Sequence, residues 1–454
     1  MSKTFRPYSP GQSFLLPPSP LEWLPEGHLA RFILDLVKEL DLARIYAHYE
    51  RELRGYPPHH PLMMVALLLY GYCVGVPSSR KIERKTHEDV AFRVISGGEH
   101  PDHTRISEFR RVHLEALAEL FVQVLKLCQK AGLVKLGMVA LDGTKVKANA
   151  SKHKAMSYDR MQTEEQRLRE KVAALLATAE KTDAAEDAEH GKGRRGDELP
   201  EELQRTQDRL RKIREAKAAL EAEAKQCKEE EQAAKDKDND DPPPGPRETP
   251  LPKHKIPTTA EGKPTDKAQR NFTDPDSRIM KTGDGFVQGY NCQAVVDAAN
   301  QIIVAEAVTN QPPDPEHLVP MLVKTVDNCG EVPEKLLGDA GYFSENNVCE
   351  PQKWGIDPYI ATGRQRHDEA PLPVRGRAPS GLTVKEAMAR KLATKAGKAV
   401  YSRRKAIVEP VFGQIKEARG LRRFLLRGLK KVRGEWSLIT LTHNILKLHV
   451  GATA

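Results

Sequence analysis

The sequence of 454 residues is 39% hydrophobic and 30% charged, and it carries a formal net charge of +9. This length exceeds one ordinary hydrophobic core, so we expect two or three domains. The basic balance favours a polyanionic partner. Six cysteines are scattered without a CxxC pair, which argues against a structural zinc site and against a disulfide framework.

The N-terminal stretch lacks the basic and apolar regions of a secretion signal. The longest apolar run, LMMVALLLYGYCVGV, is too short and too interrupted by glycine to span a membrane comfortably. We therefore expect a cytoplasmic protein in which this run forms a buried helix.

Residues 1–135 are expected to form a helical domain for DNA binding or dimerisation, because apolar residues recur at helical spacing. Two basic segments, SSRKIERKTHEDVAFRVI and PDHTRISEFRRVH, resemble a helix-turn-helix pair, although a bundle that only dimerises is the alternative. We interpret His103, beside Asp102 at a helix start, as a neighbour of the capping residue and not as a ligand. The candidate DNA contacts are Arg80, Lys81, Arg84, Arg105, Arg110 and Arg111.

The periodicity changes at KLGMVALDG, which predicts a buried strand that ends at Asp142. Residues 136–154 would hold this first strand of a catalytic domain. Residues 155–236 place apolar residues at heptad spacing in two stretches, which predicts an inserted arm of two antiparallel helices. Residues 237–270, rich in proline and charge, are expected to be a disordered linker.

The catalytic domain resumes over residues 271–454. Two β-type runs at 287–296 and 302–308 are separated by DAANQ, and a helix follows at 315–330. The segments KLLGDAGYFS and WGIDPYIATG are expected to be strands, and GKAVYSRRKAIVEPVFGQIKEARGLRR a helix. This order of elements predicts an α/β fold: an RNase H-like core with an all-α N-terminal domain and an inserted helical-hairpin arm.

Three acids stand at informative places in this order. Asp142 and Asp339 end apolar strands, and Glu409 lies on the late helix. Carboxylates held by rigid elements suit Mg²⁺, and two such ions about 4 Å apart can drive phosphodiester cleavage. We expect two Mg²⁺ ions, with Mn²⁺ as a possible substitute. The alternative for each aspartate is a turn, and for Glu409 a surface ion pair.

The segments ALDGTKVKANAS, LGDAGYF and YSRRKAIVEPVFGQIK resemble the three signature regions of bacterial insertion-sequence DDE transposases. The N-terminal segments LEWLPEGHLARFILDLV and LLLYGYCVGVPSSRKIER resemble the InsH-type domain of that group, and LTHNILKL resembles its C-terminal helix. The resemblance implies that Asp142, Asp339 and Glu409 are the catalytic, metal-binding triad. It also implies DNA contacts at Lys145, Lys147, Arg403, Arg404, Lys405 and Lys416.

One spacing departs from the pattern. Many relatives have three residues between the arginine and the glutamate of the last region, whereas four residues separate Arg404 from Glu409. This leaves open whether Arg404 or Lys405 contacts DNA.

The activity implied by the resemblance is transposition. The protein would bind transposon ends, cut them by metal-dependent hydrolysis and join the 3′-hydroxyls to target DNA by transesterification. It would act as a homodimer or a larger synaptic complex, without a membrane partner, associated with the nucleoid when bound to DNA. A catalytically inactive DNA-binding relative and a plain RNase H-like nuclease are the alternatives.

Overall fold

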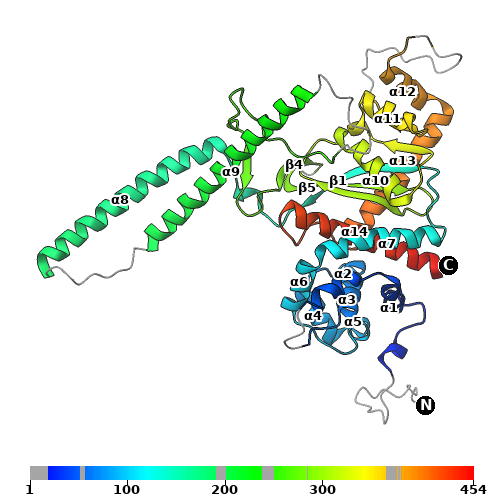
Figure 1. Cartoon of the computed structure of the whole chain (residues 1–454), viewed down its shortest axis with the longest axis horizontal. Helices are drawn as coiled ribbons and strands as arrows, with labels where there is room; N and C mark the ends of the chain where they lie inside the picture. Colours follow the sequence, from blue (N-terminus) through cyan, green and yellow to red (C-terminus); the bar gives the residue numbers. More distant parts are fainter. Residues whose placement is uncertain are drawn as a thin grey trace, which may run out of the picture.

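The computed structural model describes residues 19–51, 57–190, 201–237, 250–283, 285–363, 376, 379 and 381–453. A mixed sheet lies at the centre of the described chain, a bundle of N-terminal helices lies against one side of the central body, and a two-helix arm projects far from it (Figure 1).

The sheet has the strand order of an RNase H-like core. Its five main strands are β1 (Val139–Lys147), β5 (Gly285–Asp297), β6 (Ile303–Thr309), β7 (Lys335–Gly338) and β8 (Asp357–Ile360). They run in the spatial order β6-β5-β1-β7-β8. β6 is antiparallel to β5 and β5 is antiparallel to β1, whereas β7 is parallel to β1 and β8 is parallel to β7. The predicted fold class and the order of these strands are therefore confirmed for the core.

A sixth strand was not predicted. β4 (Arg278–Thr282) pairs with the first part of β5, and β6 pairs with the later part of the same strand. β5 is long enough to take both partners along one edge, because β-branched and aromatic residues recur along it from Phe286 to Val296.

Helices cover the sheet. α10 (Leu318–Cys329) follows a 3-10 turn at Pro315–His317 and ends at Gly330, which adopts φ +76°. α13 (Lys395–Gly413) packs on β1 and continues into a π-helical turn at Gln414–Ala418. Two further helices, α11 (Glu345–Lys353) and α12 (Val384–Ala393), were not predicted.

The N-terminal helices are held on the core by α14 (Leu429–Thr453). α14 packs against α7 (Leu114–Lys130), α3 (Pro61–Cys73) and β6, and its Trp436 is fully buried. One continuous hydrophobic cluster therefore joins the N-terminal helices to the sheet, where separate domains at residue 135 were expected. The N-terminal helices are α1 (Leu29–Glu39), α2 (Ala43–Tyr49), α3 (Pro61–Cys73), α4 (Ser79–Glu88), α5 (Val90–Ile95), α6 (His103–Val112) and α7 (Leu114–Lys130).

The apolar run from Leu62 to Val76 forms most of α3, whose residues are almost all buried, as predicted. Among the described residues, no helix combines the length and the apolar character needed to cross a membrane.

The arm consists of α8 (Tyr158–His190) and α9 (Glu201–Lys237), which pack together around a small cluster that includes Met161 and Leu220. A short β-ladder closes its base, where β2 (Ala155–Ser157) pairs with β3 (Gln269–Asn271).

The predicted disordered linker falls into two parts. Residues 238–249 lie outside the described residues. The expectation is wrong for residues 250–270, because Ile256 and Ala268 are buried against the arm. These two apolar side chains give the segment a packing surface despite its proline and charge content.

Candidate active site

Asp142 lies inside β1 and not at its end. The strand continues to Lys147, and Asp142 pairs with Ala294 of β5. The predicted strand end at Asp142 is therefore wrong. The physical reason is the length of β5, which supplies backbone partners to β1 as far as Gly289 and so prevents a turn at Asp142-Gly143.

Asp339 follows directly on β7, next to Asp142. The parallel register pairs Ala140 with Leu337, so Asp142 and Asp339 each stand two residues beyond the same rung of the ladder. The Asp339 carboxylate accepts a hydrogen bond from Gly341 N at 2.8 Å and caps a 3-10 turn at Ala340–Tyr342. The sheet thus brings together two acids that are almost 200 positions apart.

Burial and two charged neighbours act on the pKa of Asp142. Burial raises the pKa of Asp142 above its usual range, Arg404 acts against this increase, and the charge of Asp339 adds to it. Arg404 Nη1 lies 2.8 Å from Asp142 Oδ2, and these side chains are only 11% and 17% exposed. A guanidinium from α13 is therefore the cation that Asp142 contacts in this structure.

α13 and the π-helical turn after it lie over the face of β1 that carries Asp142. Asp142 and Thr144 project to the same face because side chains alternate along a strand. Arg404 binds Asp142, while Lys416 donates hydrogen bonds to the Thr144 hydroxyl and, at 3.1 Å, to Lys145 O. Glu409 stands between these two anchors along the helix, and its side chain is exposed.

Glu409, the third predicted acid, does not form a cluster of ligands with Asp142 and Asp339. Among the described residues, Asp142, Asp339 and Glu409 belong to no group of three potential ligands whose atoms all lie within 4.8 Å of one another. The sheet therefore brings Asp142 and Asp339 together, and Glu409 lies on the helix that packs on β1, with an exposed side chain.

A fourth acid, which the sequence did not suggest, lies on the other side of β1. Asp314 Oδ1 lies 3.2 Å from Lys145 Nζ, and the two side chains are 25% and 17% exposed. Lys145, a predicted DNA contact, is thus engaged inside the protein. Asp314 begins the 3-10 turn before α10, so its sequence context, Asp-Pro-Glu-His, reads as a helix start and gave no signal of this contact.

The remaining predicted DNA contacts differ in exposure. Arg110 is buried and donates hydrogen bonds to Tyr72 Oη at 3.2 Å and to Pro77 O at 2.8 Å. It therefore does not belong to the predicted contact surface, because its guanidinium holds the interior of the helical bundle. Exposed basic side chains occur at Arg80, Lys81, Arg84, Arg105, Arg111, Lys147, Arg403 and Lys405.

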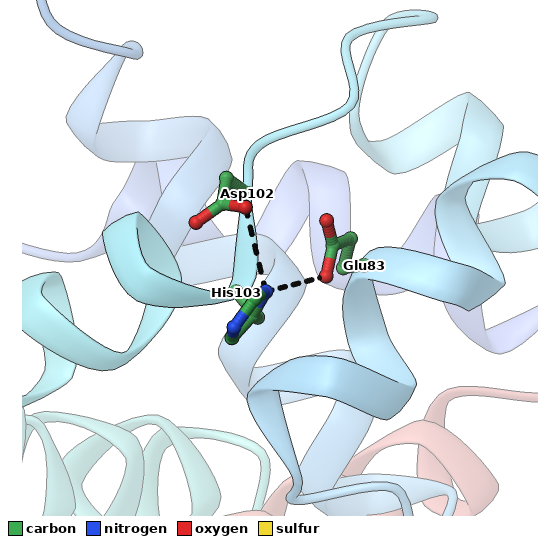
Figure 2. A group of neighbouring side chains, drawn as sticks. All are labelled: Glu83, Asp102 and His103. Carbon is green, nitrogen blue, oxygen red and sulfur yellow. Dashed lines mark hydrogen bonds and ion pairs between the residues drawn. The ribbon is translucent and has the colours of Figure 1, made fainter.

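His103 joins two of the helices that carry these basic residues. Figure 2 shows its ring between Glu83 of α4 and Asp102, the capping residue of α6. Its Nδ1 lies 2.9 Å from Glu83 Oε2 and 3.4 Å from Asp102 Oδ2. The ring and the two carboxylates therefore link α4 to the start of α6. The predicted cap neighbour thus also makes a contact that local sequence does not reveal.

The residues around Asp142 and Asp339 fit a divalent cation. Two hard oxygen donors stand side by side on the adjacent central strands β1 and β7 of a rigid sheet, and burial already disfavours the charge on Asp142. A cation placed between them would relieve both the burial cost and the mutual repulsion.

Comparison with known families gave two matches. A model described as a transposase domain (DUF772) matches residues 18–112, and a transposase DDE domain model matches residues 378–449. The second match includes Arg404, Glu409 and Lys416 but neither aspartate. No curated protein and no solved structure matches the chain. A DDE domain implies an RNase H-like fold and the use of divalent metal ions, in agreement with the strand order and the paired aspartates.

Proposed function

We propose that the chain is an insertion-sequence DDE transposase that cuts the ends of a mobile DNA element and joins them to target DNA, and the two matching transposase models support this proposal. One observation carries this proposal: Asp142 and Asp339 stand side by side on adjacent parallel strands, beneath a helix that carries Glu409. The three acids occur in the order Asp, Asp, Glu, which the resemblance implies.

Asp142, Asp339 and Glu409 would hold the metal, which we propose to be two Mg²⁺ ions, replaceable by Mn²⁺. When bound, such ions activate water and neutralise charge on the phosphate. We assign the third ligand to Glu409 because Arg404 and Lys416, on either side of it, both contact the Asp142 face of β1. Its exposed carboxylate is accessible to a DNA end and to an ion that arrives with it.

Two phosphoryl transfers would follow at this site. In the first, a water oxygen bonds to phosphorus at the element end and the bond from phosphorus to the 3′-oxygen breaks, which leaves a 3′-hydroxyl and a 5′-phosphate. In the second, that hydroxyl attacks a phosphorus of target DNA and displaces a 3′-oxygen there. Each step exchanges one phosphorus–oxygen bond for another, so no nucleophilic side chain is needed.

The chain's own contribution would be to bind and orient DNA. The side chains of Lys147, Arg403 and Lys405 are exposed on β1 and α13, the elements that carry Asp142 and Glu409, and would contact phosphates. The basic residues of α4 and α6 would bind the element end farther from the cut, as a homodimer or a larger synaptic complex. The net charge of +9 favours this partner.

Replacement of Asp142 by Asn tests the assignment. The amide keeps the shape of the side chain but weakens metal binding, so we expect Asp142→Asn to lose Mg²⁺-dependent cleavage of an element end while DNA binding persists. Asp327→Asn, at an exposed position on α10, is the matched control and should cut normally. Cleavage by Asp142→Asn at the wild-type rate would contradict the assignment.

The same assay separates the alternatives. An inactive relative would bind ends without cutting them, and a plain nuclease would cut without forming joined products. The presence of all three acids argues against an inactive relative, and the large helical N-terminal domain argues against a plain nuclease.

A further inference from the structure

The Asp314 carboxylate accepts hydrogen bonds from side chains of both β1 and β5. Its Oδ1 accepts hydrogen bonds from Asn291 Nδ2 at 2.7 Å, Gln293 Nε2 at 3.0 Å and Lys145 Nζ at 3.2 Å. These donors sit on paired strands, with Lys145 opposite Asn291. Lys145 Nζ also donates to Pro312 O at 3.1 Å, which fixes the segment that carries Asp314.

This network lies against the backbone beside both catalytic aspartates. A Cβ at Gly143, next to Asp142, would lie 2.6 Å from Gln293 Nε2 and 3.2 Å from Asp314 Oδ1. A Cβ at Gly341, close to Asp339, would lie 3.7 Å from Asp314 Oδ2. The Asp314 carboxylate therefore reaches from one glycine to the other, beneath the two strands whose acids form the site.

Tyr342 closes the network. This residue is fully buried, and its hydroxyl donates a hydrogen bond to Gln293 Oε1. Burial raises the pKa of Tyr342 well above its usual range, and the charges of Asp314, Asp142 and Asp339 raise it further. The hydroxyl thus stays protonated and fixes the orientation of the Gln293 amide, whose nitrogen then points to Asp314.

From these contacts we propose that Asp314 is a positioning residue for the metal-binding aspartates, acting through Lys145, Gln293 and Tyr342. It holds β1 and the turn after β7 at a fixed separation, and its charge balances Lys145 so that the ammonium does not oppose a cation at the site. Hydrogen-bonded groups behind metal ligands typically change metal affinity by about 10- to 100-fold. This inference rests on the proposed function.

The test is metal binding at the site, measured apart from DNA cleavage. Bound Fe²⁺, with ascorbate and peroxide, generates radicals that cut the polypeptide backbone near the ligands. We expect Asp314→Asn in the full chain to need on the order of 10-fold more Fe²⁺ for half-maximal backbone cutting beside Asp142 and Asp339. Asp327→Asn is the control and should match the wild type.

A second variant covers the case in which Asp314→Asn does not fold. Tyr342→Phe keeps every charge and nearly all the volume but leaves Gln293 Oε1 without its donor, so we expect a shift of ~5-fold in the same direction. A purely structural role would lower the melting temperature and leave the Fe²⁺ midpoint of the folded chain unchanged, which would overturn the inference.

The two proposals fail differently. Wild-type cutting beside Asp142 and Asp339 with an unchanged midpoint in both variants would refute the role of Asp314 alone. An absence of such cutting in the wild type would refute the metal assignment and, with it, this inference.

Discussion

Removal of the Arg404 guanidinium should destabilise the protein until a metal replaces it. In Arg404→Met the Asp142 carboxylate loses its ion-pair partner at 2.8 Å, while the repulsion from the Asp339 carboxylate remains. Breaking a buried ion pair costs about 3–5 kcal/mol, whereas an exposed pair contributes about 0–1 kcal/mol. Since the two side chains are 11% and 17% exposed, we expect a loss of about 2 kcal/mol in the free energy of unfolding.

Urea unfolding of the full chain at pH 7 without divalent ions measures this loss. The double variant Arg404→Met/Asp142→Asn removes both charges, so it should be more stable than the sum of the single effects by about 1 kcal/mol or more. Saturating Mg²⁺ should stabilise Arg404→Met more than the wild type, because the ion has no guanidinium to displace.

Arg403→Met is the matched control, since Arg403 is exposed one residue earlier on the same helix. Its effect should stay within about 0.5 kcal/mol. A loss of that small size for Arg404→Met, or strict additivity in the double variant, would refute the ion-pair reasoning.

Two further predictions concern stability elsewhere. Burial lowers the pKa of His443 from its usual value of 6.5 to about 3. The neutral ring therefore contributes stability that is fully present above pH 6.5 and is lost as the pH falls from 6.5 toward 3. The free energy of unfolding at pH 5 should be about 2 kcal/mol lower than at pH 7. Urea unfolding of His443→Gln should show a shallower acid dependence, and exposed His153→Gln should not. Leu220→Ala, in the arm core, should speed hydrogen exchange in α8 and α9 but not in β1, because that core is a separate cluster; equal acceleration in β1 would contradict this separation.

Strong local patterns predicted the elements of the core. The alternating and β-branched runs gave β5 and β6, and the apolar runs before Asp339 and around Tyr359 gave β7 and β8. β4 was missed because Arg-Ile-Met-Lys-Thr is short and half polar, and only its pairing with β5 makes it a strand. Gly143 suggested a turn, yet it serves close packing under a continuous strand.

The site was predicted only in part, because register over long distances decides the rest. Asp142 and Asp339 each follow an apolar run, which is a local signal. The contact of Lys145 with Asp314 depends on the pairing of Lys145 with Asn291 and on the path of the chain after β6. Neither of these can be predicted from a short segment of sequence. The same holds for Arg404, which turns toward Asp142 and not toward solvent.

The position of α14 in the chain has a consequence for biosynthesis. The N-terminal helices bury α3 and α7 against a helix made of residues 429–453. During translation, the apolar surface of these helices that α14 buries therefore stays exposed until some 300 later residues have been synthesised. A nascent chain would complete the packing of its N-terminal helices only after the central sheet has been synthesised in the same molecule.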